Sequence, residues 1–123
     1  MTVQAVFLVA CGGAIGAVLR FGVGAVLKTP GFPWATLGVN LLGSLAMGLL
    51  MGWLLRQPTP QEALRLFLAV GLLGGFTTFS AFSMDVFALI EKRDALALSG
   101  YVGGSLLGGL ALFVAGFLLM RTG

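Results

Sequence analysis

Four long apolar segments, separated by short polar connections, limit most strongly what this chain can fold into. They extend over about residues 3–27, 34–55, 63–90 and 95–120. A helix needs about 20 consecutive apolar residues to cross the hydrocarbon core of a bilayer, and each segment reaches that length. The sequence therefore predicts an all-α integral membrane protein with four transmembrane helices.

The composition supports the same fold class. Only 9% of the 123 residues are charged and 59% are hydrophobic, whereas a soluble domain has about 25% charged residues. So few charges cannot cover a surface that faces water. The four segments use the whole chain, so we expect residues 1–123 to form a single membrane domain. Because Met1–Gln4 contain no basic residue, we expect the first segment to be retained rather than cleaved as a signal peptide.

The sequence disfavours several classes of function. It has no histidine and one cysteine, Cys11, inside an apolar segment, so we expect neither a disulfide framework nor a His/Cys metal site. It contains no nucleophile–base pair, phosphate-binding loop or pair of carboxylates, so we do not expect an enzyme. The net charge is +3, but the basic residues are too few and too scattered for a nucleic-acid partner. Lipid headgroups and an anionic solute remain as candidate partners.

The third segment contains residues that disfavour a continuous helix. Gly74–Ser83 reads Gly-Gly-Phe-Thr-Thr-Phe-Ser-Ala-Phe-Ser, and both glycine and β-branched threonine are poor helix formers. The sequence therefore predicts that the third helix breaks in the middle of the membrane, near Gly74–Thr78. Non-helical backbone at that depth must be buried in protein or line a wet cavity, and the carbonyl groups that a break frees can bind a cation.

Glycines recur four residues apart in every segment. In membranes such spacing allows helix backbones to approach closely, which predicts tight helix–helix packing. The series are Gly12/Gly16, Gly48/Gly52, Gly71/Gly75 and Gly100/Gly104/Gly108.

The Lys and Arg residues do not favour one orientation in the membrane. Four spans place both termini on one side, and an excess of Lys and Arg normally marks the cytoplasmic side. Either the chain inserts both ways and pairs as a dual-topology antiparallel dimer, or flanking hydrophobicity or Arg20 fixes one orientation. The side of the termini carries Arg56, Arg65 and Arg121, and the other side carries Lys28, Lys92 and Arg93.

Two polar side chains within or near the first two spans have alternative roles. Asn40 can form a helix–helix hydrogen bond, or it can offer an N–H to a passing anion. Arg20 can extend to the membrane interface, or it can line an aqueous vestibule that concentrates anions. Asp85, near the end of the third span, either offsets Arg20 or is solvated.

Aromatic and hydroxyl side chains near and after the expected break also have two interpretations. Phe79 and Phe82 are three residues apart and share a helix face. They either pack in the core and against lipid, or present their electropositive ring edges to an anion. Tyr101 and Ser105 are four apart, so their hydroxyls form a short polar stripe, and Ser83 adds a hydroxyl near the break. Alternatively, the serine hydroxyls bond back to helix carbonyls.

Taken together, these motifs resemble the Fluc family of fluoride channels, also called CrcB proteins. The resemblance covers the whole chain in length, number of spans and order of motifs. Its most specific part is the third-span motif together with the asparagine segment upstream. The matching segments are Gly12–Gly16 leading to Arg20-Phe21, Gly38–Ser44 and Gly74–Ser83.

The resemblance implies a dual-topology antiparallel homodimer in the plasma membrane (the bacterial inner membrane), with two pores that export fluoride passively. It implies a structural Na⁺ at the dimer centre, held by the backbone carbonyls of Gly74 and Thr77, and a vestibule arginine at Arg20. Gly109 stands where the family's polar track usually continues with a hydroxyl. The implied fluoride-pore residues are Asn40, Phe79, Phe82, Ser83, Tyr101 and Ser105.

Two other classes compete with a channel. A small multidrug-type proton-coupled exporter also has four short spans, but coupling there needs a membrane carboxylate, normally in the first span. This chain has no acidic residue in its first two spans. A structural or assembly protein of the membrane would give no reason for Asn40, Arg20 and a broken third span to occur together.

Overall fold

The computed structural model describes residues 1–122, and its helices are joined by short connections. The first two spans are single helices, α1 (Val3–Val26) and α2 (Trp34–Leu55). The third span comprises α3 (Glu62–Leu64), the π-helix η1 (Arg65–Leu73), α4 (Gly74–Phe76) and α5 (Phe79–Glu91). The fourth comprises α6 (Ala95–Gly103), the π-helix η2 (Gly104–Gly108) and α7 (Gly109–Thr122).

The four predicted spans are confirmed. Helices long and apolar enough to cross a membrane extend over Val3–Val26, Trp34–Leu55, Glu62–Glu91 and Ala95–Thr122. The expected boundaries lie within two residues of these at every end. The chain is therefore a multi-pass membrane protein of the all-α class.

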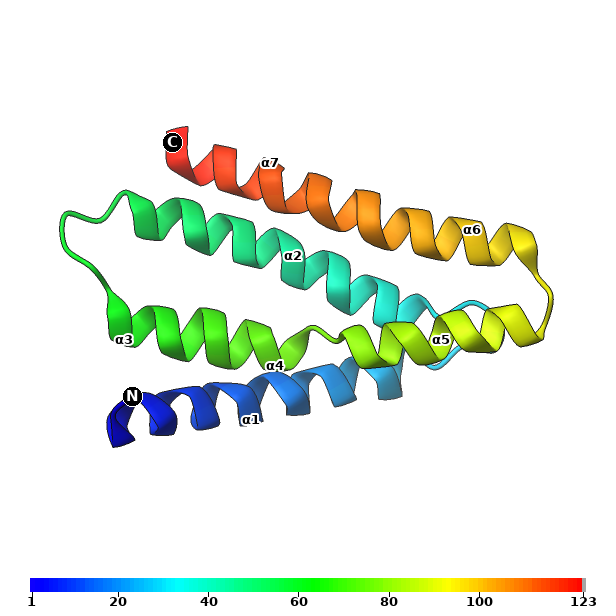
Figure 1. Cartoon of the computed structure of the whole chain (residues 1–123), viewed down its shortest axis with the longest axis horizontal. Coiled ribbons are helices and arrows are strands. Elements are labelled where there is room, and N and C mark those ends of the chain that lie inside the picture. Colours follow the sequence, from blue (N-terminus) through cyan, green and yellow to red (C-terminus); the bar gives the residue numbers. More distant parts are fainter. Residues whose placement is uncertain (123) are drawn as a thin grey trace.

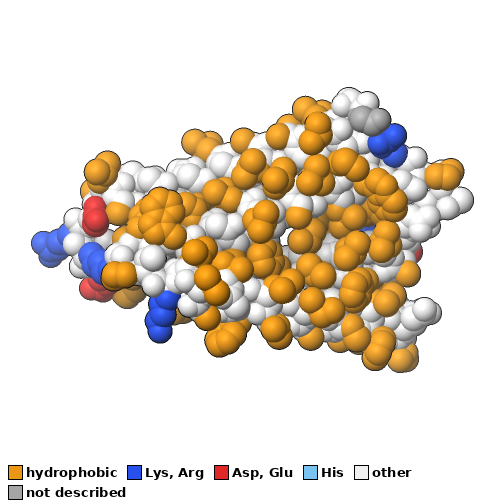
Figure 2. Space-filling model, turned by 180° about the vertical axis from the view of Figure 1, so that it is seen from behind, with side chains coloured by type: hydrophobic (Ala, Val, Ile, Leu, Met, Phe, Trp, Pro, Cys, Tyr) orange, Lys and Arg blue, Asp and Glu red, His pale blue; other side chains and the backbone are white. Residues whose placement is uncertain are grey.

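The spans lie side by side, with both termini at the same end of the molecule (Figure 1). α1 packs along η1 and α4, and α2 packs along α7. Hydrophobic side chains cover much of the lateral face, and charged side chains lie mostly toward the ends (Figure 2). At the end with the termini, Arg56 Nη1 donates to the carbonyl of Met120 at 3.1 Å.

Local signals explain where the helices begin and end. Thr2 caps α1, since its Oγ1 accepts from the N–H of Ala5 at 3.0 Å. α5 ends in a tight turn at Arg93, whose φ of 54° lies in the left-handed region. There the N–H of Asp94 donates back to Leu89 at 3.3 Å, which is a Schellman-type closure. Asp94 Oδ1 then caps α6 by accepting from Ala97 at 3.0 Å.

Glycines permit the closest helix contacts. A Cβ on Gly16 would overlap the carbonyl oxygen of Leu72, and one on Gly75 would lie 2.6 Å from the carbonyl oxygen of Gly13. Likewise, a Cβ on Gly48 would overlap the carbonyl of Phe113 on α7. These contacts are to backbone, so a side chain there would push the helices apart. The prediction of tight packing through spaced glycines is thus confirmed between α1 and the third span and between α2 and α7.

Two glycines of the fourth-span series, Gly100 and Gly104, are different. A Cβ on Gly100 or Gly104 would meet no atom of residues 1–122 within 4 Å. This part of the series therefore does not mediate packing within one chain.

The third span is broken, but over fewer residues than expected. Thr77 (φ −81°, ψ 155°) and Thr78 (φ −149°, ψ 122°) are extended, and α5 begins at Phe79. The break thus lies within the expected region, Gly74–Thr78, but Gly74 and Gly75 remain helical in α4. At Gly75 the missing side chain serves the close approach to α1, whereas β-branched threonines suit the extended backbone.

Candidate functional site at the break in the third span

The side chain of Asn40 on α2 holds the break through two hydrogen bonds to one residue. Its Nδ2 donates to the carbonyl of Thr78 at 3.0 Å, and its Oδ1 accepts from the N–H of Thr78 at 2.8 Å. An extended residue has no helical partners, so the amide of Asn40 replaces both of them. One N–H of Asn40 is not used by these two bonds.

The same arrangement diverts donors from two backbone carbonyls. In a continuous helix the N–H of Thr78 would donate to Gly74 and that of Ala81 to Thr77. Here the N–H of Thr78 donates to Asn40, and that of Ala81 donates to Thr78 Oγ1 at 3.1 Å. The hydroxyl of Thr77 is itself engaged, because it donates to Leu73 at 2.9 Å. The carbonyls of Gly74 and Thr77 therefore lose their helical donors.

Arg20 lies beside the break and lines a cavity. Its Nε donates to the carbonyl of Gly75 at 3.4 Å. The cavity has a volume of about 400 Å³, and its wall includes Lys28, Thr36 and Thr78. Arg20 and Lys28 thus line one cavity, which is the geometry that a vestibule role for Arg20 requires. Two cations on the wall of one cavity would raise the local concentration of anions.

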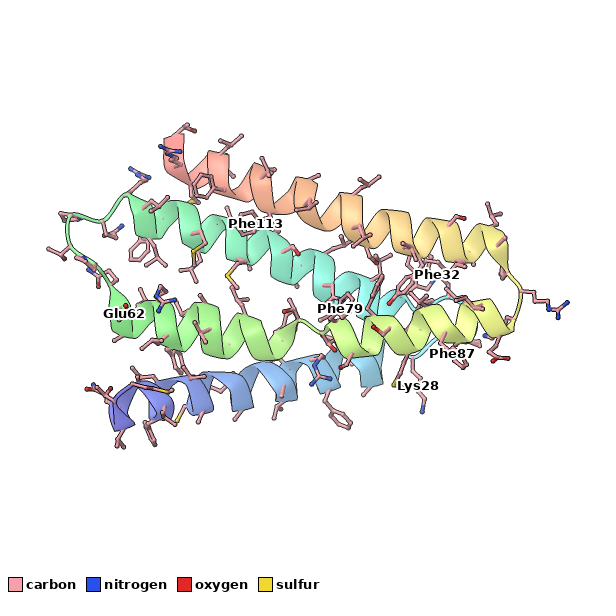
Figure 3. All side chains as sticks on the ribbon, in the orientation of Figure 1. Lys28, Phe32, Glu62, Phe79, Phe87 and Phe113 are labelled. Atoms are coloured by element: carbon pink, nitrogen blue, oxygen red, sulfur yellow. The ribbon has the colours of Figure 1, made fainter. Side chains whose placement is uncertain are left out.

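A second cavity, of about 300 Å³, lies against the break. Its wall includes the side chains of Asn40, Phe79 and Phe113. Phe79 opens α5 directly after the break, and Phe113 comes from α7 (Figure 3). Thr78 lines both cavities. The basic vestibule and the aromatic cavity therefore meet at the extended segment.

Phe79, Phe82 and Tyr101 form a chain of rings along one side of the site. The Phe79 and Phe82 ring centroids are 5.6 Å apart, and Phe82 stacks on Tyr101 at 5.2 Å. Phe32 meets Tyr101 edge to face at 5.6 Å. The Phe79 residue is 75% exposed although its ring lines the aromatic cavity. The structure thus brings together three residues expected to contribute to the pore.

The hydroxyl groups expected to line the pore do not form a continuous hydrogen-bonded row. Ser83 Oγ donates to the carbonyl of Phe79 at 3.1 Å, which is the back-bonding alternative. The fully buried Tyr101 donates its hydroxyl to Asp85 Oδ2 at 2.9 Å. Ser105 Oγ is buried and has no hydrogen-bond partner among residues 1–122. Within one chain, Tyr101 and Ser105 are therefore not linked into a hydrogen-bonded track.

Sequence reasoning missed two features of this site. Asp85 accepts the Tyr101 hydroxyl, a contact that neither of the two roles considered for it had included. Ser44 on α2 lines the aromatic cavity, although it was not singled out as a site residue. Its position four residues after Asn40, on the same helix face, was the signal that could have identified it.

The fold and the site define a class of membrane protein. A helix interrupted at membrane depth, between a basic vestibule and an aromatic cavity, is an arrangement of channels and transporters, in which irregular backbone lines the path of the solute. The comparisons with known proteins name the family within that class.

The family model described as CrcB-like protein, Camphor Resistance (CrcB), matches residues 7–117. A relative from Hyphomonas neptunium, named fluoride-specific ion channel FluC, is 52% identical over 118 residues, which cover 93% of each chain. A relative of the same name from Sphingopyxis alaskensis is 49% identical over 121 residues, or 96% of each chain. The chain belongs to the CrcB family.

Proposed function

We propose that this protein is a fluoride-selective channel of the bacterial inner membrane, through which fluoride leaves the cell passively. The structural observation that carries the proposal is the Thr77–Thr78 break, which separates the Arg20 vestibule from the Phe79 cavity. The relatives' name, fluoride-specific ion channel, supports the choice of ion. The exporter alternative is not supported, because those relatives are named channels and the first two spans lack a carboxylate.

The side chains at the site suit an anion that must lose water without being held tightly. Fluoride is small and strongly hydrated, so a pore has to replace its water contacts with donors of similar strength. Arg20 and Lys28 would attract the ion to the vestibule, and the spare N–H of Asn40 would meet it at the break. The ring edges of Phe79 and Phe82 are weakly electropositive and would let the ion pass on.

We further propose an antiparallel homodimer whose two third spans meet at the break. Gly74 and Phe79, which lie on either side of the break, are both exposed in one chain. Because the N–H groups of Thr78 and Ala81 donate elsewhere, the carbonyl oxygens of Gly74 and Thr77 lack their helical donors. These oxygens are therefore suited to bind a cation. A structural Na⁺ bound there would neutralise the partial negative charges of these carbonyls. A second copy would double the number of oxygen ligands, because a two-fold interface uses the same surface twice.

The dimer proposal predicts that the chain inserts in both orientations. An epitope tag at the C-terminus should be accessible from both faces of the membrane in similar amounts, because the two ends of the bundle carry balanced positive charge. Accessibility from one face alone would contradict the antiparallel arrangement, whatever ion the protein passes.

The channel proposal is tested by fluoride efflux from liposomes that contain the purified protein. With an ionophore to carry the counter-ion, fluoride should leave rapidly when the pH is equal on both sides. A proton gradient of either sign should leave the efflux rate unchanged at a fixed membrane potential. Efflux that requires a proton gradient would instead indicate an exporter, and no efflux at all would indicate a structural protein.

A further inference from the structure

Ser105 lines a further cavity, separate from the vestibule. Ser105 lies in η2, and its Oγ is buried without a hydrogen-bond partner among residues 1–122. The cavity has a volume of about 420 Å³, and its wall includes Ser44, Ser105, Gly109 and Phe113. A buried hydroxyl in a native protein normally has a partner, so an ion or water in this cavity is the expected partner of Ser105.

Ser44 lies between this cavity and the cavity at the break. It lines both, together with Phe113. It follows Asn40 by four residues on α2, so the two side chains occupy the same helix face one turn apart. None of the hydrogen bonds found within residues 1–122 involves the Ser44 hydroxyl. The hydroxyl is therefore available to a solute that passes between the cavities.

Gly109 on α7 makes room for the Ser44 hydroxyl. Gly109 is buried, and a Cβ built on it would lie 3.4 Å from Ser44 Oγ, with no closer neighbour. Ser44 Oγ therefore stands next to the space where a side chain of residue 109 would begin. A hydroxyl carried by residue 109 and the hydroxyl of Ser44 would occupy neighbouring positions on the same cavity wall.

We infer that Ser44 is a fluoride-contacting residue of the pore, which supplies from α2 the hydroxyl that Gly109 does not supply from α7. The inference rests on the proposed fluoride conduction. Fluoride that leaves the cavity of Asn40 and Phe79 meets the O–H of Ser44 and then that of Ser105. Each hydroxyl donates one neutral hydrogen bond, which is strong enough to replace a water and weak enough to release the ion.

The experiment uses fluoride efflux from liposomes with four variants of the full chain. Ser44→Ala should lower the efflux rate about tenfold, the effect of losing one hydrogen bond. Ser44→Ala/Gly109→Ser should return to within about twofold of the wild-type rate, because α7 then supplies the hydroxyl. Ser44→Ala/Gly109→Ala, which adds the same carbon without the oxygen, should stay at the rate of Ser44→Ala. Ser99→Ala, an exposed serine on α6 that lines neither cavity, should match the wild type.

The outcomes separate this inference from the proposed function. If the wild type conducts fluoride and Ser44→Ala conducts it equally fast, the role of Ser44 is wrong but the channel proposal stands. The same conclusion follows if Gly109→Ala rescues Ser44→Ala as well as Gly109→Ser does. If Ser44→Ala does not give a monodisperse protein, Ser105→Ala takes its place, since that hydroxyl forms no hydrogen bond within residues 1–122. A normal rate in Ser105→Ala would then overturn the path, and a wild-type protein that passes no fluoride would overturn both proposals.

Discussion

Replacement of Asn40 by aspartate is expected to lower fluoride efflux about a hundredfold or more. The carboxylate keeps an acceptor for the N–H of Thr78 but loses the donor to the Thr78 carbonyl, 3.0 Å away. A buried carbonyl without its donor costs about 1–3 kcal/mol, and about 1.4 kcal/mol corresponds to a factor of ten in rate. The new negative charge next to the Thr78 carbonyl also repels a passing anion.

Asn40→Ala separates these two causes. It removes both hydrogen bonds to Thr78 without adding a charge, so its rate should lie between those of the wild type and Asn40→Asp. Liposome efflux is measured on fractions that elute at the wild-type position in size-exclusion chromatography. Wild-type efflux in Asn40→Asp would show that the break does not depend on this side chain and that no anion passes beside it.

Replacement of Phe82 by isoleucine is expected to lower fluoride efflux about tenfold. Isoleucine keeps most of the apolar volume but has no ring edge, so the proposed quadrupole contact with the ion is lost. Quadrupole contacts between two aromatic rings contribute about 0.5–1.5 kcal/mol, and a contact of similar size with the ion corresponds to about tenfold in rate. The substitution also removes a ring that stacks on Tyr101 at 5.2 Å, so thermal stability must be measured alongside efflux.

Phe87→Ile provides the matched control on the same helix. Phe87 is 62% exposed on α5 (Figure 3) and, unlike Phe82, makes no ring contact with Phe79 or Tyr101. It should lose a similar amount of apolar surface while efflux stays at the wild-type rate. Equal loss of efflux in both variants would mean that isoleucine acts through packing, and unchanged efflux in Phe82→Ile would remove its ring from the mechanism.

The spans could be predicted because the bilayer imposes a simple rule on the sequence. A helix must stay apolar for about 20 residues, and here polar or charged residues interrupt the pattern only at the connections. The segments around Pro30 and Pro58 and the turn at Arg93 thus fixed the boundaries to within two residues. The break was predictable from Thr77 and Thr78 for a similar reason, since the residue types themselves disfavour a helix.

Features that depend on the register between helices could not be predicted. Gly74 and Gly75 disfavour a helix as strongly as the threonines, but the approach of Gly75 to Gly13 keeps them helical. The alternatives for Asn40 stayed open because the sequence does not show that Thr78 faces it. The Asp85–Tyr101 hydrogen bond joins two spans and has no sequence signal. The π-helices η1 and η2 also had no sequence signal. This geometry is often found at functional sites.

The central claim is that this interrupted helix provides a path for fluoride and not for halides in general. The most direct test compares the initial rates of fluoride and chloride efflux from matched liposomes, with ion-selective electrodes and at equal pH on both sides. The account predicts rapid loss of fluoride, while chloride is retained as in liposomes without protein. Chloride that leaves as fast as fluoride, or fluoride that is retained, would contradict it.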